Sequence, residues 1–187
     1  VIADLDIVNP YFRTKDSEKD LNSLGIELVC SELANTNVDT PALPKDIYRI
    51  IADKSKYVVM DIGGDERGAL ALGRYSEDIL EENNYEMLFV VNPYRPLTST
   101  PEDAVEVMRE IEAVSKIKFT AIVNNSNVGN DTTENDVISC DEYINKLKQL
   151  TGLEVVMTTA TKTVAEKLQN HYNNVFEITS PFCFKIR

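Results

Sequence analysis

Short apolar runs rich in β-branched residues alternate with longer amphipathic stretches, and this alternation restricts the fold more than any other feature of the chain. Runs with the composition of strands lie at residues 1–5, 26–29, 57–60, 87–91, 119–123, 153–157 and 175–178. Stretches with the apolar spacing of helices lie at residues 17–24, 43–53, 68–82, 101–114, 133–150 and 163–172. Strands that alternate with helices are typical of βα units. The sequence therefore predicts an α/β fold with a mainly parallel sheet flanked by helices.

Length and composition favour one cytoplasmic domain. The chain has 187 residues, of which 43% are hydrophobic, so we expect residues 1–187 to form a single domain around one core. No apolar run approaches the roughly 18 residues of a membrane helix, and the first residues lack the pattern of a signal peptide. The three cysteines, Cys30, Cys140 and Cys183, form no C-x-x-C pair, which argues against a disulfide framework or a zinc site. We expect no membrane partner.

The charge of the chain narrows the possible ligands. The formal net charge is -12, and the 19 Lys and Arg residues are scattered along the sequence, so direct binding of nucleic acid is disfavoured. A nucleotide is still compatible, because helix N-termini and loop amides hold phosphate locally, usually together with Mg2+.

Polar residues directly after predicted strands are the first candidates for a site, because open α/β sheets bind ligands beyond the carboxyl ends of their strands. Asp61 ends one such strand and is followed by Gly63 and Gly64. The carboxylate suits Mg2+ or its bound waters, and a glycine lets a backbone N–H approach a phosphate. The alternative is that the two glycines only form a tight turn between a strand and a helix.

Asp4 and Asp6 form a second candidate at the end of the first predicted strand. Side chains two residues apart lie on the same side of an extended chain, so the two carboxylates repel each other unless a cation or hydrogen-bond donors lie between them. This spacing predicts a pair that faces a metal ion. The alternative is that Asp6 caps a loop while Asp4 makes a local hydrogen bond.

The run from Asn124 to Asn127, with Asn125 and Ser126 between them, is the third candidate. GTP-binding proteins read guanine with an N-K-x-D motif, and this run has amides where the Lys and the Asp should stand. An amide both donates and accepts hydrogen bonds, which suits the N1/N6 edge of adenine. The run therefore favours adenine over guanine, and the alternative is a polar loop rich in turn-forming Asn.

Four ordered segments, at residues 34–44, 57–75, 88–96 and 122–129, together with D-L-D-I-V-N-P-Y-F-R at residues 4–13, resemble the MinD/ParA/CobQ-like P-loop ATPases with a deviant Walker motif. The resemblance implies a Rossmann-like three-layer sandwich that binds Mg-ATP, and a possible homodimer. It also implies roles for single residues: Asp61 as the Walker B acid, Asp4 as support for Mg2+, Asp6 as the group that orients the attacking water, Gly64 as part of switch II, and Asn125 as a contact to adenine.

The chain departs from that family in one respect that matters for activity. The family has a Gly-rich loop ending in G-K-[ST] before the strand that opens this sequence, and no Gly-Lys-Thr or Gly-Lys-Ser occurs here. That loop supplies the amide cradle, the phosphate-binding Lys and a hydroxyl ligand of Mg2+. We therefore expect a chain that lacks the first strand and the P-loop helix, binds ATP weakly, hardly hydrolyses it, and associates through the apolar faces that are left uncovered.

Two other functions are compatible with the same residues. The first is a Mg-dependent phosphatase of the haloacid-dehalogenase type, with a D-x-D-x-[TV] motif at Asp4, Asp6 and Val8, Asp4 as nucleophile and Asp6 as acid/base. Its distal metal ligands would be Asp61 and Asp65. The second is a non-catalytic switch in which the bound nucleotide controls an interaction with a partner.

Overall fold

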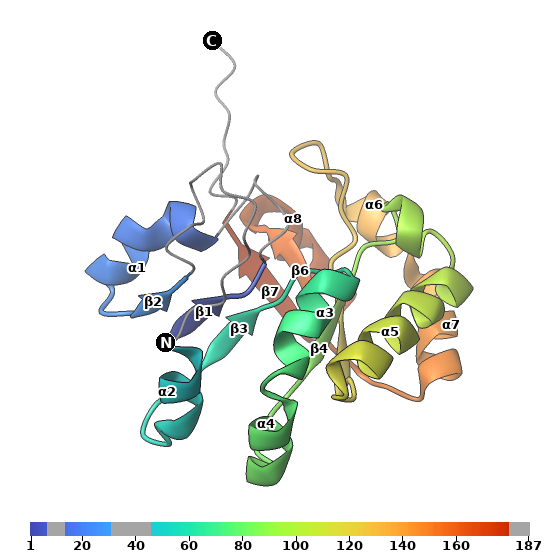
Figure 1. Cartoon of the computed structure of the whole chain (residues 1–187). Coiled ribbons are helices and arrows are strands. Elements are labelled where there is room, and N and C mark those ends of the chain that lie inside the picture. Colours follow the sequence, from blue (N-terminus) through green and yellow to red (C-terminus); the bar gives the residue numbers. More distant parts are fainter. Residues whose placement is uncertain (7–13, 31–45, 180–187) are drawn as a thin grey trace. The chain divides into compact units, whose positions relative to one another are not determined.

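The computed structural model describes residues 1–6, 14–30 and 46–179. Contacts divide the chain into two compact units. Unit 1 comprises Val1–Tyr85 and Ile111–Ile117, and unit 2 comprises Glu86–Glu110 and Lys118–Arg187. Each unit has its own parallel sheet, so the predicted α/β class with parallel strands flanked by helices is confirmed (Figure 1).

Unit 1 has a three-stranded sheet in the order β2-β1-β3, in which both strand pairs are parallel. Its strands are β1 (Ile2–Asp4), β2 (Leu28–Val29) and β3 (Val59–Asp61). Its helices are the 3-10 turn η1 (Thr14–Ser17), α1 (Glu18–Ser23), α2 (Ile47–Ala52), α3 (Glu66–Gly73) and α4 (Ser76–Glu82). Because β1 lies between the other two strands, both of its edges are hydrogen bonded.

Unit 2 has a four-stranded parallel sheet in the order β4-β5-β6-β7. Its strands are β4 (Leu88–Val91), β5 (Ala121–Asn124), β6 (Val155–Thr161) and β7 (Val175–Ile178). Its helical elements are η2 (Pro96–Thr98), α6 (Glu134–Ile138), α7 (Asp141–Thr151) and α8 (Lys162–Leu168), together with most of α5 (Pro101–Ser115). The strand order follows the sequence order, as expected for successive βα units.

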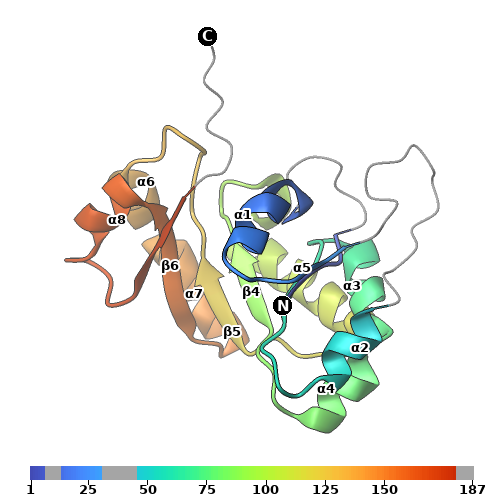
Figure 2. The ribbon, with the colours of Figure 1, turned by 90° about the vertical axis from the view of Figure 1, so that its left-hand side faces the viewer.

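Each unit buries an apolar cluster of its own. In unit 1, Ala3 and Leu5 at β1 pack with Val29 of β2, with Tyr75, and with the buried face of α2, which consists of Ile47, Ile50 and Ile51. In unit 2, Val137 of α6 and Ala160 of β6 pack with Val164, Ala165 and Leu168 of α8. Figure 2 shows α6 and α8 beside β6. Leu5 follows β1 and Ala160 lies near the end of β6, so each cluster packs at the carboxyl end of a strand.

The stretch predicted as one helix at residues 68–82 is two helices, α3 and α4, and this part of the prediction was wrong. A β-carbon on Gly73 would lie 2.9 Å from the carbonyl oxygen of Val114, so the end of α3 packs directly on the backbone of α5's last turn. Tyr75 is not helical, and the hydroxyl of Ser76 donates to the Gly73 carbonyl at 2.9 Å. A tertiary contact therefore ends α3 where the apolar spacing continues.

The stretch predicted at residues 133–150 is also two helices, α6 and α7. Thr133 begins α6 with a capping box, in which its hydroxyl accepts from the backbone N–H of Asp136 and the Asp136 carboxylate accepts from the backbone N–H of Thr133. The hydroxyl of Ser139 and the thiol of Cys140 then donate to the Asp136 carbonyl, at 2.9 Å and 3.4 Å. These side-chain hydrogen bonds occupy the Asp136 carbonyl where α6 ends, and the chain changes direction there before α7 begins.

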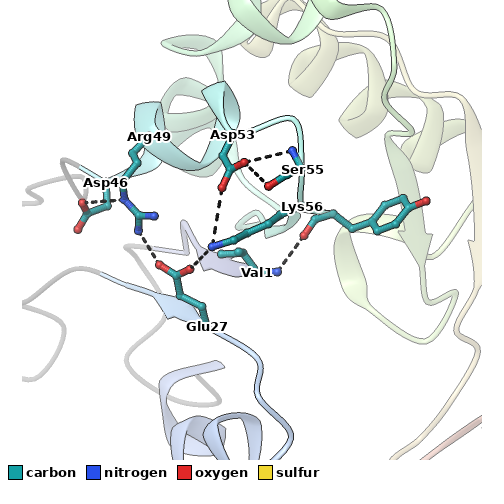
Figure 3. Close-up of polar contacts among 8 residues, drawn as sticks. Val1, Glu27, Asp46, Arg49, Asp53, Ser55 and Lys56 are labelled. Atoms are coloured by element: carbon teal, nitrogen blue, oxygen red, sulfur yellow. Dashed lines mark hydrogen bonds and ion pairs between the residues drawn. The ribbon is translucent and has the colours of Figure 1, made fainter.

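A surface ion-pair network joins Glu27, the residue before β2, to α2 and to the segment before β3 (Figure 3). Glu27 accepts from the Arg49 guanidinium at 2.5 Å and from the Lys56 ammonium at 3.1 Å. Arg49 also contacts Asp46, at 3.5 Å, and Lys56 also contacts Asp53, at 3.8 Å. Because hydrogen bonds from Arg49 and then Lys56 favour the ionised form, the pKa of Glu27 lies below its ordinary value.

Acid is expected to weaken unit 1 through Glu27. A carboxylate whose folded pKa is lowered contributes stability that is present above its unfolded pKa and is lost as the pH falls through its folded pKa. Glu27→Gln should therefore reduce the stability difference between neutral and acidic pH, and high salt should reduce it as well, since the pairs are on the surface. Carboxyl NMR titration of Glu27 measures this pKa directly, and a value at or above that of an unpaired Glu would contradict the prediction.

Candidate functional site

Asp4 and Asp61 lie side by side at the carboxyl ends of two neighbouring strands of unit 1. They are register partners in the parallel pair of β1 and β3, and the backbone N–H of Leu5 continues the ladder by donating to the Asp61 carbonyl at 2.8 Å. Register partners on adjacent strands lie on the same face of a sheet. The fold therefore brings two carboxylates from distant parts of the sequence to the carboxyl end of the sheet. Together with Asp6, which follows β1, we call them the acidic strand end (Asp4, Asp6 and Asp61).

The two carboxylates of this pair differ in accessibility. Asp4 is only 6% exposed, and its Oδ1 accepts from the backbone N–H of Asp6 at 3.1 Å. This is the local hydrogen bond that the alternative interpretation of the D-x-D pair predicts. Asp61 is exposed, and its Oδ2 accepts from the hydroxyl of Thr14 at 2.6 Å. Asp61 is therefore the carboxylate that a ligand can reach most easily.

Gly63 and Gly64 follow Asp61 but meet different surroundings. A β-carbon on Gly63 would lie 3.0 Å from Asp6 Oδ1, so the Asp6 side chain approaches this glycine closely. Gly64 is exposed, has no atom within 4 Å of an added β-carbon, and does not have a left-handed backbone. Packing therefore explains Gly63, whereas neither packing nor backbone conformation requires a glycine at position 64.

Gly68, in the first turn of α3, packs most tightly at this turn and was not among the predicted site residues. A β-carbon there would lie 2.3 Å from the Gly63 carbonyl oxygen and 2.7 Å from its α-carbon. Asp65 caps the same helix, since its Oδ1 accepts from the Gly68 backbone N–H at 2.9 Å. The sequence pattern that could have identified Gly68 is a pair of glycines, Gly63 and Gly68, on either side of an Asp N-cap. With no side chain at either position, the helix can pack directly against the turn.

The acidic strand end offers oxygen ligands only. Within the described part of the chain, no three His, Cys, Asp or Glu side chains come close enough together to hold a metal ion by themselves. Mg2+ takes oxygen ligands and is usually held by one or two carboxylates, with waters and substrate phosphates in the other positions. The paired carboxylates of Asp4 and Asp61 fit that requirement better than they fit a metal that needs a closed protein cage.

The loop after β5 in unit 2 is ordered by hydrogen bonds among its own polar groups. Asn124 is 1% exposed, and its Oδ1 accepts from both the backbone N–H and the hydroxyl of Ser126, at 3.1 Å and 2.6 Å. Asn127 donates from Nδ2 to the Asn125 carbonyl at 2.8 Å, and its Oδ1 accepts from the Gly129 N–H at 3.3 Å. Asn124 thus shapes the loop, and Asn125 is left as its half-buried residue nearest the strand end.

Two residues that support this loop were not among the predicted site residues. Asn92, directly after β4, accepts from the Asn127 N–H at 3.3 Å and donates to the Asn127 carbonyl at 2.9 Å. Thr159 of β6 donates its hydroxyl to Asn125 Oδ1 at 2.7 Å. Asn92 stands directly after a predicted strand, in the segment 88–96 that carries part of the resemblance, but the sequence assigned it no role. Thr159 could not have been found from the sequence, because the predicted strand stops at residue 157 and β6 continues to Thr161.

The predicted site residues fall into the two units, and each group is described by itself. Asp4, Asp6, Asp61, Gly63 and Gly64 belong to unit 1, and Asn124, Asn125 and Asn127 belong to unit 2. That the two groups serve one ligand stays a prediction. Val8, which the phosphatase alternative needs, and residues 34–44, which carry part of the resemblance, lie outside the described residues.

Comparison with known proteins adds no relative: no protein-family model, curated protein or solved structure matches the chain. Among the helices of residues 1–6, 14–30 and 46–179, none combines the length and the apolar composition that crossing a lipid bilayer requires.

Proposed function

We propose that this chain is the nucleotide-binding part of a P-loop-type ATPase of the MinD/ParA/CobQ-like class, and that the full-length gene product binds Mg-ATP at the carboxyl ends of its strands. One observation carries the proposal: Asp4 and Asp61 are register partners at the carboxyl ends of adjacent parallel strands, and Gly64 follows them without a packing reason to be glycine. An exposed carboxylate beside a bare backbone segment is suited to a metal-bound polyphosphate.

The residues of the acidic strand end have separate tasks in this proposal. Asp61 and Asp4 hold Mg2+ or its waters, and Asp6 orients the water that attacks the terminal phosphate. Gly64 lets its backbone N–H approach that phosphate. When bound, Mg2+ supplies positive charge that offsets the charge of the phosphates. Because the net charge is -12, a cation beside an anionic ligand also reduces the repulsion between that ligand and the chain.

The loop after β5 contributes the contact to the base. Asn125 bears the side chain that reads adenine, and Asn124 and Asn127 keep the loop in shape through the hydrogen bonds given above. On the strength of the resemblance alone, the proposal extends to a cytoplasmic location and to a homodimer.

Binding measurements on the full-length gene product test the proposal. Calorimetric titration with ATP in the presence of Mg2+ should give saturable binding, and EDTA should weaken it by about tenfold or more, which corresponds to roughly 1.4 kcal/mol. Absence of binding at millimolar Mg-ATP, or binding that EDTA leaves unchanged, would contradict it.

Gly64→Ala is expected to weaken Mg-ATP binding by about tenfold while the stability of the fold stays within about 0.5 kcal/mol of the wild type. An added methyl group meets nothing within 4 Å in the chain itself, so only an incoming ligand would be hindered. Calorimetry measures the affinity and urea unfolding measures the stability. Equal affinity of variant and wild type would mean that the phosphate does not approach Gly64.

A further inference from the structure

The side-chain amide of Asn125 has a fixed orientation, and the hydrogen bonds of the loop show why. Asn127 is oriented by two backbone groups whose roles are unambiguous: its Nδ2 donates to the Asn125 carbonyl at 2.8 Å, and its Oδ1 accepts from the Gly129 N–H at 3.3 Å. The atom of Asn127 that points to Asn125 is therefore its NH2 group. An NH2 group needs an acceptor opposite it, so the Asn125 atom at 3.2 Å must be the oxygen, Oδ1.

A second donor completes this arrangement from the neighbouring strand. Because β5 and β6 pair with Asn124 opposite Thr158, the next residues, Asn125 and Thr159, also lie side by side. The Thr159 hydroxyl donates to Asn125 Oδ1 at 2.7 Å. A carbonyl oxygen has two lone pairs, and here one donor occupies each of them. The oxygen of Asn125 has no remaining capacity for a ligand.

The NH2 group of Asn125 is the part of the amide that can meet a ligand. Among the described residues it has no hydrogen-bond partner, and no described buried side-chain nitrogen or oxygen lacks one, so this nitrogen is open to solvent. Asn125 thus presents a donor and no acceptor. This differs from the expectation that its amide would both donate to and accept from the base.

We infer that Asn125 reads a ring nitrogen of a purine base as a hydrogen-bond donor, and that Thr159 and Asn127 are the positioning residues that fix this choice. Adenine presents ring nitrogens as acceptors, whereas its 6-amino group only donates and cannot pair with an NH2 group. The inference rests on the proposed function, and it assigns specificity to Thr159, a residue that does not itself meet the base.

A panel of nucleotides tests the inference on the full-length gene product. The three deaza-ATPs each replace one ring nitrogen (N1, N3 or N7) with CH, and purine riboside triphosphate lacks the 6-amino group. We expect the wild type to bind one of the deaza-ATPs about fivefold more weakly than ATP, the effect of one net hydrogen bond. In Asn125→Ala that difference should vanish, and any effect of the missing 6-amino group should be the same as in the wild type.

Two further variants separate this role from a loss of structure. Asn125→Asp keeps an oxygen for Thr159 and for Asn127 but has no NH2 group to donate to a ring nitrogen, so it should bind ATP and that deaza-ATP equally well, as Asn125→Ala does, with an unchanged melting temperature. Thr159→Val should reduce the sensitivity to the deaza substitution, because the amide is no longer held, and Thr159→Ser should restore it.

These measurements distinguish a failure of the inference about Asn125 from a failure of the proposed function. If the wild type binds Mg-ATP but its deaza profile does not change in Asn125→Ala or Thr159→Val, or if Asn125→Ala removes the effect of the 6-amino group instead, the inference is wrong and the proposed function stands. If the wild type does not bind Mg-ATP at all, both are wrong.

Discussion

Asp61→Ala is expected to lower magnesium-dependent ATP hydrolysis by the full-length gene product about a hundredfold or more, with little change in the fold. Asp61 is exposed at the end of β3, and its side chain accepts one hydrogen bond, from Thr14. Removing it should therefore cost little packing. If its carboxylate holds Mg2+ or the metal's waters, the variant loses charge stabilisation at the transferring phosphate, where one such interaction has a large effect on rate.

The matched control for this variant is Asp20→Ala. Asp20 is an exposed carboxylate on α1 of the same unit, and its loss changes the net charge by the same amount. We expect wild-type hydrolysis from the control and equal urea midpoints for both variants. Unchanged turnover in Asp61→Ala would count heavily against the ATPase proposal.

An aryl phosphate assay on the same protein distinguishes the ATPase from the phosphatase alternative. A haloacid-dehalogenase-type enzyme would use Asp4 as the nucleophile and would release phosphate from a simple aryl phosphate in a reaction that Asp4→Asn abolishes. Asp4 is 6% exposed and accepts a hydrogen bond from the backbone of Asp6, which suits a supporting position better than that of an attacking group. We therefore expect no aryl phosphate hydrolysis above the buffer rate.

Gly68→Ala is expected to destabilise unit 1 by about 2 kcal/mol, the largest effect on stability that we predict. The added β-carbon would lie 2.3 Å from the Gly63 carbonyl oxygen, so α3 would have to move away from the turn after β3. Overpacking against a backbone costs about 3 kcal/mol, and the better helix propensity of Ala returns about 1 kcal/mol. Gly64→Ala is the matched control, because the same methyl group meets open space there.

Urea unfolding of the two glycine variants measures this difference. We expect a lower midpoint for Gly68→Ala with a similar slope, and a midpoint near that of the wild type for Gly64→Ala. A Gly68→Ala protein as stable as the wild type would show that helix propensity outweighs the contact with Gly63.

The strands could be predicted from the sequence because each is a short, separate apolar run. The strand at residues 175–178 has its predicted bounds, and the others shift by one to four residues. The breaks between α3 and α4 and between α6 and α7 could not be predicted from apolar spacing. They depend on the packing of Gly73 against Val114 and on side-chain bonds to the Asp136 carbonyl.

In the candidate site, too, some residues can be identified from the local sequence, and others depend on contacts between distant segments. Asp4 and Asp61 were found because each stands near the end of a short apolar run, and the structure makes each the last residue of its strand and pairs the two in register. Gly68 and Thr159 were missed because their roles come from segments that meet only in the fold: a helix on a turn, and β6 beside the loop after β5. The direction of the Asn125 amide likewise depends on four hydrogen bonds that no linear motif records.

Whether one nucleotide engages both groups of residues is best measured by following backbone and side-chain amide NMR signals of the full-length gene product during titration with Mg-ATP. We expect the backbone amide of Gly64 and the side-chain amide of Asn125 to shift together, with a single dissociation constant. If neither signal moves at saturating ATP, or if only one of them responds, the assignment of a Mg-ATP site to these residues is contradicted.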